Sequence, residues 1–361
     1  MPDEPNGREP ISWRIRRWAA PFALALSVAA SIGAVQLFAD GDTASALSHD
    51  GRRMPRFTLA AGRMGGTSSE GGPTPWFQVS TIQQDKVKPV DSVPPPSSAG
   101  SAQAILAGPH GTFAVSSLQE KACESRLYRF GLTGDGHVKE IEPLSEDVIP
   151  ARADGLAISP DGDRIAYATT PCTNTAEPRA TVTVMDIGSG HRRTWTTAAP
   201  SVVGEIVWAR DDHTLGYTLS DVRPATGRPG APYKRDVGNV TVHALDTAKA
   251  GTDLRAGRVL FRQPAGPGAV TSAVMNPDGR TGYGTMKAPS SIMLFSFTAG
   301  KPMKVTKTIR VKPNTLMVMD VVTRDGPRYA CLDGLDAFGR VVEGGFMNSS
   351  GGSGCTVAYA Y

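Results

Sequence analysis

The sequence predicts an all-β protein: a β-propeller of about six four-stranded blades, preceded by one N-terminal transmembrane or signal helix. A tight-turn motif recurs about 45 to 65 residues apart. Each copy joins two short apolar segments, and two further strand-like segments follow it. The 361 residues include 40 glycines and 28 prolines, which suits many short strands joined by turns. An uncharged apolar run near the N-terminus predicts the helix.

The recurring turn is clearest at residues 159–162, which read Ser-Pro-Asp-Gly. Proline presets φ at the second turn position, aspartate is tolerated at the third, and glycine takes a left-handed conformation without steric penalty. Such a turn closes a hairpin between two apolar strands. Related turns occur at 276–279 and, with drift, at 108–111, 209–212 and 323–326. These copies are consistent with five to seven blades.

Strands predicted at both ends of the repeat region suggest how a ring of blades would close. Two segments precede the first copy, at 77–81 and 86–93, and the alternating sequence CTVAYAY ends the chain at Tyr361. We expect the N-terminal pair and the C-terminal strand to share one sheet. Closure would remove two open sheet edges that otherwise invite aggregation.

An insertion at 221–239 explains the longest interval between turns. It contains glycine and proline without apolar periodicity and is therefore predicted to be a loop. It is the place where a departure from a regular surface is most expected. We expect it to be a contact loop, with Tyr233, Lys234 and Arg235 as its exposed side chains.

Residues 18–39 carry no charged side chain and are long enough to cross a hydrocarbon core roughly 30 Å thick. Arginines precede this run and aspartates follow it, so the positive-inside rule predicts a single-pass protein with a short cytoplasmic tail at 1–17. Residues 40–75 are rich in Gly, Ser, Thr and charge and are predicted to be a flexible tether. The propeller then spans 76–361, outside the cytoplasm.

Two other interpretations of residues 18–39 remain open. Ala44-Ser45-Ala46 fits the small-x-small pattern of a cleavage site, so the protein is alternatively secreted after cleavage near Ala46. The site lies beyond the apolar run, and that run is long for a signal peptide, which favours the uncleaved anchor. A buried core helix is the second alternative.

The four cysteines are placed as two pairs by the repeat. Cys123 and Cys172 occupy the same register in adjacent repeats, after the second strand, so a bridge between neighbouring blades is predicted. Cys331 and Cys355 both fall in the last repeat and are the second predicted pair. Disulfides would fit an oxidising, extracytoplasmic compartment. Four independent buried thiols are the alternative.

The sequence contains no recognisable catalytic motif. It has no G-x-S-x-G, no G-x-x-x-x-G-K-[S/T] and no H-E-x-x-H, and its six histidines are scattered without metal-ligand spacing. We therefore predict that the protein is not an enzyme and that it has no catalytic residue, no cofactor and no metal. The formal net charge of +4 is nearly balanced and does not predict a nucleic-acid partner.

Basic residues gather at 301–312, in KPMKVTKTIRVK. The pattern is typical of a solvent-facing outer strand whose lysines block edge pairing. Contact with an anionic envelope polymer or with lipid headgroups is the alternative.

Two segments carry a resemblance to a known family. LAISPDGDRIAYA at 156–168 and MNPDGRTGYGT at 275–285 resemble the repeats of TolB-like and WD-repeat-like bacterial β-propellers. The layout of apolar helix, tether and repeats, with the Arg-Thr-Trp-Thr strand at 193–196, resembles membrane-anchored propeller proteins of high-GC Gram-positive bacteria. Some of those relatives carry a sigma-factor-binding domain before the helix. Only residues 1–17 precede it here, too few for such a domain.

The function predicted from these features is a non-catalytic, extracytoplasmic binding or scaffold module. Its expected partner is a protein, a peptide or an anionic envelope polymer, with the membrane contacted through residues 18–39. One alternative is an enzyme, of lyase or lactonase type, with its site assembled at the propeller channel. A purely structural envelope protein is the other, because one fold hosts many functions.

Overall fold

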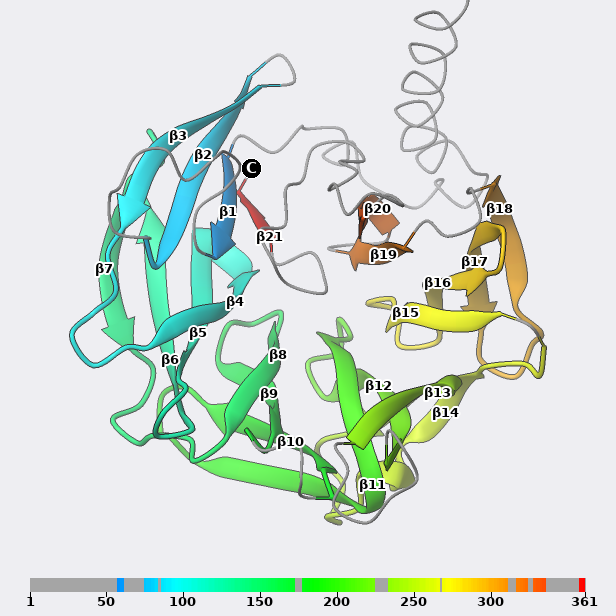
Figure 1. The fold of residues 1–361 in the computed structure, drawn as a ribbon. Helices are drawn as coiled ribbons and strands as arrows, with labels where there is room; N and C mark the ends of the chain where they lie inside the picture. The colour runs from blue at the N-terminus through cyan, green and yellow to red at the C-terminus, as the bar shows by residue number, and fades with distance from the viewer. Residues whose placement is uncertain are drawn as a thin grey trace, which may run out of the picture. The chain divides into compact units, whose positions relative to one another are not determined.

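The described part of the protein is built from antiparallel sheets that follow one another along the chain (Figure 1). The computed structural model describes residues 57–61, 75–83, 86–172, 177–224, 233–266, 268–310, 316–323, 327–335 and 357–360. The chain divides into two units, Met1–His49 and Asp50–Tyr361, and every described residue belongs to the second. Residues 1–17, the predicted helix at 18–39 and the signal-cleavage alternative near Ala46 lie outside the described residues. Within the described ranges, no helix is both long and apolar enough to cross a membrane.

The first repeat forms a four-stranded sheet in the order β4-β5-β6-β7. Its strands are β4 (Ser101–Ala107), β5 (Thr112–Gln119), β6 (Glu124–Leu132) and β7 (Val138–Pro143). Strand β5 is buried on both faces from Phe113 to Leu118. A strand buried on both faces needs a layer on each side, and neighbouring sheets supply these layers.

The second and third repeats join into one seven-stranded sheet in the order β14-β13-β12-β11-β10-β9-β8. Its strands are β8 (Arg152–Ile158), β9 (Arg164–Thr170), β10 (Arg179–Asp186), β11 (Arg192–Trp208), β12 (Thr214–Pro224), β13 (Tyr233–Asp246) and β14 (Arg258–Arg262). Strand β11 is shared, because its first half pairs with β10 up to Pro200 and its second half pairs with β12 from Ser201. The last strand of one repeat thus runs directly into the first strand of the next.

The fourth repeat is a four-stranded sheet, and a further strand pair follows it. The strands are β15 (Ala269–Met275), β16 (Thr281–Ala288), β17 (Ser291–Thr298), β18 (Lys304–Arg310), β19 (Leu316–Thr323) and β20 (Pro327–Leu335). Gly282 and Gly284 of β16 lie opposite Phe297 and Phe295 of β17. A Cβ atom at either glycine would stand less than 3 Å from the opposing ring, so these glycines make room for the two aromatic side chains.

Both ends of the described region share one sheet, in the order β21-β1-β2-β3. Its strands are β1 (Phe57–Ala61), β2 (Phe77–Gln83), β3 (Lys86–Val93) and β21 (Val357–Ala360). The expectation that the C-terminal strand joins the N-terminal strands in a sheet is confirmed. Strand β1 falls inside 40–75, so the tether predicted there does not extend unbroken to residue 75. Phe57 and Leu59 are buried, and this five-residue strand is too short to reveal its alternation against a Gly- and Ser-rich background.

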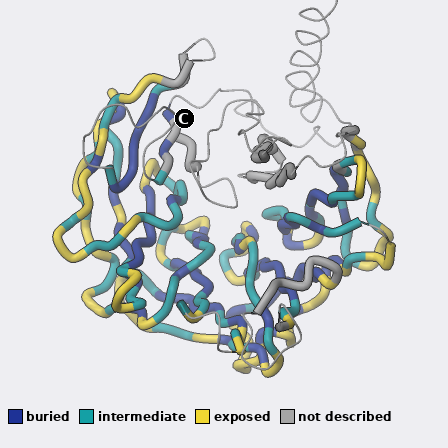
Figure 2. The backbone as a smooth tube through the Cα atoms, viewed as in Figure 1, coloured by how far each residue is buried: buried dark blue, intermediate teal, exposed yellow. Residues whose placement is uncertain are grey.

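Among the described residues, four apolar clusters lie between neighbouring units: the β21-β1-β2-β3 sheet and the first repeat, and then each successive pair up to the fourth repeat. Figure 2 shows the buried stretches of the strands that carry them. Between the β21-β1-β2-β3 sheet and the first repeat, Phe77 stacks on Phe130 with ring centroids 4.8 Å apart. Between the second and third repeats, Trp195, Trp208 and Tyr217 are buried together. Successive repeats therefore pack face against face in this part of the chain, which is a propeller-like arrangement.

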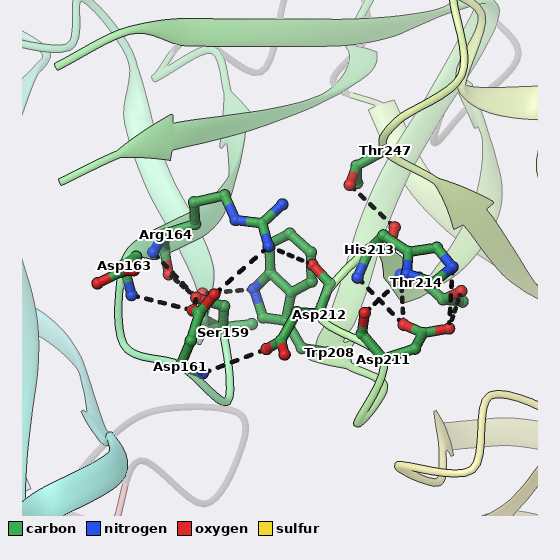
Figure 3. Close-up of polar contacts among 11 residues, drawn as sticks. Ser159, Asp161, Asp163, Arg164, Trp208, Asp211, Asp212, His213, Thr214 and Thr247 are labelled. Carbon is green, nitrogen blue, oxygen red and sulfur yellow. Dashed lines mark hydrogen bonds and ion pairs between the residues drawn. The ribbon is translucent and has the colours of Figure 1, made fainter. Parts of the chain in front are cut away.

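The predicted turns of successive repeats contact one another (Figure 3). The Asp161 amide donates to the Asp212 carboxylate at 3.2 Å, and Arg164 donates to the Asp212 carbonyl at 2.5 Å. The Arg164 guanidinium lies 5.1 Å from the ring centroid of Trp208. The next contact continues the series, because the Arg210 amide donates to the Pro277 carbonyl at 2.8 Å. These turns thus close hairpins and also join successive repeats.

Candidate binding site

A polar pocket of about 230 Å³ lies on the outer strands of the third repeat. Strands β12, β13 and β14 and the short 3-10 turn η4 (Leu254–Ala256) form it. Its lining residues are Asp221, Asn239, Thr241, His243, Arg255, Val259 and Arg262. Of these, only Val259 is apolar, so the pocket is suited to a polar ligand.

The pocket lies where the β12–β13 hairpin extends beyond its sheet. Pairing of β11 with β12 ends at Asp221, whereas β12 and β13 continue to pair out to Pro224 and Tyr233. Among the described strands, no third strand accompanies this extension. The expectation that 221–239 is a loop throughout is therefore wrong, because both ends of the insertion continue the flanking strands. Residues 225–232 lie outside the described residues.

The three residues predicted to be exposed contacts belong to strand β13. Arg235, Lys234 and Tyr233 pair with Val222, Arg223 and Pro224 of strand β12. The backbone ladder fixes their register on the hairpin extension, next to the pocket residue Asp221. That they make contacts with a partner stays a prediction.

Arg255 and Asp221 form the fixed part of the pocket. The Arg255 guanidinium donates to an Asp221 carboxylate oxygen and, at 2.8 Å, to the Ser201 hydroxyl. Asn239 donates its side-chain amide to the other carboxylate oxygen of Asp221. Asp253, just before Arg255, caps turn η4 by accepting from the Arg255 amide at 2.8 Å. Both oxygens of Asp221 are therefore engaged, and its charge is balanced by Arg255.

His243 forms the buried floor of the pocket, and its partners define its tautomer. Its Nδ1 lies 3.1 Å from the Gly257 carbonyl, which can only accept, so Nδ1 carries the proton. Its Nε2 then accepts from the Thr241 hydroxyl at 3.0 Å. The ring stacks on Tyr217 with centroids 5.5 Å apart. Burial lowers the pKa of His243 below its ordinary value, so the imidazole is neutral near pH 7.

Arg262 and Val259 form the open side of the pocket. Arg262 lies directly opposite Thr241 in the β13–β14 ladder, and its side chain is exposed. Val259 has 39% of its surface exposed, and among the residues that the structure describes only Val305 is another large apolar side chain that is as exposed. No hydrogen bond or ion pair holds the Arg262 guanidinium within the described residues. The lining therefore carries two arginines against one aspartate, with a neutral histidine beneath them.

We expect the free energy of unfolding to fall as the pH is lowered below about 6.5, because of His243. Its pKa is lowered in the folded state, by burial first and also by Arg255 and Arg262, while the Gly257 carbonyl and Asp253 oppose the shift. The unfolded chain therefore binds the proton first, and stability is lost by up to about 1.4 kcal/mol per pH unit until the folded pKa is reached.

Urea unfolding at pH 7.5, 6.5 and 5.5 measures this dependence. His243→Gln is expected to flatten the curve over that range, because glutamine does not titrate. The matched control is His213→Gln, which removes a half-exposed histidine from a turn and is expected to keep the slope. Equal slopes for wild type and His243→Gln would show that the buried imidazole is not the titrating group.

The Cys123–Cys172 disulfide predicted from the repeat is confirmed, with the two Cα atoms 5.8 Å apart. Cys123 lies between β5 and β6, and Cys172 lies just after β9, so the bond joins adjacent sheets. Cys331 is in strand β20, whereas Cys355 lies outside the described residues, so their pairing stays a prediction. Within the described ranges, no three His, Cys, Asp or Glu side chains are placed to hold a metal ion.

The sequence contained a signal for the pocket that motif searches do not detect. In strand β13 the polar residues Asn239, Thr241 and His243 alternate with Val240, Val242 and Ala244. Alternating side chains of a strand point to the same face, so the three polar residues share one face. The arginines that complete the pocket follow up to 41 positions after Asp221, and only the folded chain brings them there.

No protein-family model matches this chain, and no curated protein sequence matches it. Solved structures that resemble it include a prolyl endopeptidase, at a TM-score of 0.38 and 15% identity, covering 69% of this chain and 37% of that one. Hydrazine synthase of Kuenenia stuttgartiensis has a TM-score of 0.40 and 15% identity, covering 74% and 77%. The apocarotenoid oxygenase of Synechocystis has a TM-score of 0.42 and 11% identity, covering 72% and 62%. This chain thus spans little more than a third of the prolyl endopeptidase.

Proposed function

We propose that the sheets close into a six-bladed propeller that acts as a non-catalytic binding module outside the cytoplasm, held to the membrane by residues 18–39. In this proposal β19 and β20 belong to the fifth blade, and the sheet β21-β1-β2-β3 is the sixth blade and closes the ring. The TolB-like and WD-repeat-like resemblance of the repeats agrees with this architecture. The Cys123–Cys172 disulfide supports the placement, because such bonds persist in oxidising compartments.

The observation that carries the binding function is the hairpin extension with the polar pocket at its base. In this blade β11 stops pairing with β12 at Asp221, whereas β12 and β13 continue to pair beyond it as a two-stranded projection. Insertions on a rigid scaffold are where binding residues are commonly placed. The pocket beside it is held in shape by Arg255, Asp221 and Ser201, so a ligand would meet preformed groups.

A shortened hairpin tests this function. The variant replaces residues 223–234 by an Asn-Gly turn between Val222 and Arg235, which face each other in the ladder. Full-length wild type, cross-linked in the membranes of its own cells and solubilised, is expected to carry a stoichiometric partner that the shortened variant loses. Both proteins should melt alike, because the described positions that are removed, 223–224 and 233–234, pair only with each other and not with β11 or β14.

The control for this experiment is Lys249→Ala, in the exposed turn after β13, which is expected to retain the partner. Retention of the partner by the shortened hairpin would refute the role of the extension. Absence of any partner from wild type would refute the binding function itself and favour the structural or enzymatic alternatives.

A further inference from the structure

We propose that the pocket beside the β12–β13 hairpin binds the carboxylate of a small organic acid, with Arg262 as the residue that pairs with it. This inference rests on the proposed binding function and names its ligand class. The proposal rests on Arg262, which has no partner among the described residues, on the neutral His243 beneath it and on the apolar Val259 beside it. The pocket has a volume of about 230 Å³.

The charge of the pocket favours a single negative charge on the ligand. Asp221 is balanced by Arg255 and also accepts from Asn239, so it does not compensate Arg262. His243 adds no charge because its pKa is lowered. One positive charge thus remains for the ligand, and a monoanion matches it better than a dianion, which Asp221 would also repel.

The hydrogen-bonding groups favour a carboxylate among the monoanions. A guanidinium presents a planar fork of donors that fits the two oxygens of a carboxylate. Arg262 faces Thr241 across the β13–β14 ladder, so the two side chains lie on one face of the sheet, and both line the pocket. The Thr241 hydroxyl donates to His243 and keeps its lone pairs, which suit a hydroxyl or amide N–H on the rest of the ligand.

The size and the wall of the pocket favour an organic acid rather than an inorganic ion. A volume of about 230 Å³ is smaller than typical pockets for drug-sized ligands but larger than an inorganic monoanion needs. Val259 offers a half-exposed apolar surface on the same strand as Arg262. A ligand with a carboxylate at one end and a small partly apolar body would cover both residues.

Isothermal titration calorimetry of the full-length protein in detergent tests this proposal with two matched pairs of probes. The first pair is N-acetyl-L-alanine and its amide, and the second is D-glucuronate and D-glucose. At least one acid is expected to bind, and its neutral partner is expected to bind at least tenfold more weakly. The acid that binds tells whether the body of the ligand is peptide-like or sugar-like.

Arg262→Gln is expected to weaken binding of that acid at least tenfold, and Arg262→Lys is expected to restore part of the loss. Arg262 is exposed, so both variants should fold as wild type does. Arg280→Gln removes the same charge from an exposed turn of the next repeat and is expected to leave the affinity unchanged.

Three outcomes would overturn the proposal: no binding of either acid, equal binding of an acid and its neutral partner, or an unchanged affinity in Arg262→Gln. Each would leave the binding function standing if the hairpin still captures its partner. Retention of the partner by the shortened hairpin, with acid binding intact in wild type, would instead refute the hairpin as the partner's contact and leave the acid site standing.

Discussion

Deletion of residues 357–361 is expected to lower the free energy of unfolding by on the order of 4 kcal/mol. Strand β21 pairs with β1 at four positions, from Phe57 opposite Ala360 to Ala60 opposite Val357. A backbone hydrogen bond contributes about 1 kcal/mol net, and the deletion removes this ladder. It also exposes an edge of β1, whose unpaired groups favour association between molecules.

Chemical denaturation of the deletion variant measures the loss, and light scattering at rising protein concentration measures association. The matched control removes Tyr361 alone, which lies just beyond β21, and is expected to unfold like wild type. An unchanged denaturation midpoint for the five-residue deletion would show that the β1–β21 pairing does not support the fold.

Replacing Cys123 and Cys172 by serine is expected to cost about 2–4 kcal/mol of unfolding free energy. The bond closes a loop with a sequence separation of 49 residues, for which the chain-entropy model gives about 4 kcal/mol. It also joins the connection between β5 and β6 to the segment after β9, so its loss loosens the junction between two sheets. We expect the double variant to fold but to unfold at a lower denaturant concentration.

Reduced wild type provides the control for the disulfide. In the same reductant, it and the double variant should unfold at the same denaturant concentration. The double variant also tests the second predicted pair. A further loss of stability when that variant is reduced is expected if Cys331 pairs with Cys355. A double variant that unfolds at the wild-type midpoint without reductant would contradict the stabilising role of the Cys123–Cys172 bond.

Local sequence was sufficient for the turns and for most strands. Pro, Asp and Gly at 159–162 and 276–279 favour one backbone path, and the apolar segments on either side fit a pleated strand. The register of Cys123 and Cys172 was visible for the same reason, because both follow the second strand of their repeat. Strand β1 was missed, because FTLAA is too short to predict a strand by itself. It forms one only through pairing with distant strands, which bury Phe57 and Leu59.

The candidate pocket could be predicted only in part. The polar alternation of Asn239, Thr241 and His243 marks one face of a strand, but alternation does not distinguish an exposed face from a site. Two features convert it into a pocket: the loop that returns Arg255 to Asp221, and the strand that places Arg262 opposite Thr241. Both depend on contacts between residues far apart in the chain.

The sequence alone determined the all-β class, the repeat, the turns and the Cys123–Cys172 pairing, because each follows from backbone preferences or from register within a repeat. The tertiary structure alone decided that β11 serves two repeats, that β1 and β21 share a sheet, and that the insertion extends a hairpin beside an arginine-lined pocket. Those features depend on long-range strand pairing and on which charges become neighbours after folding. Local backbone preferences do not determine which distant strands pair or which charged side chains become neighbours.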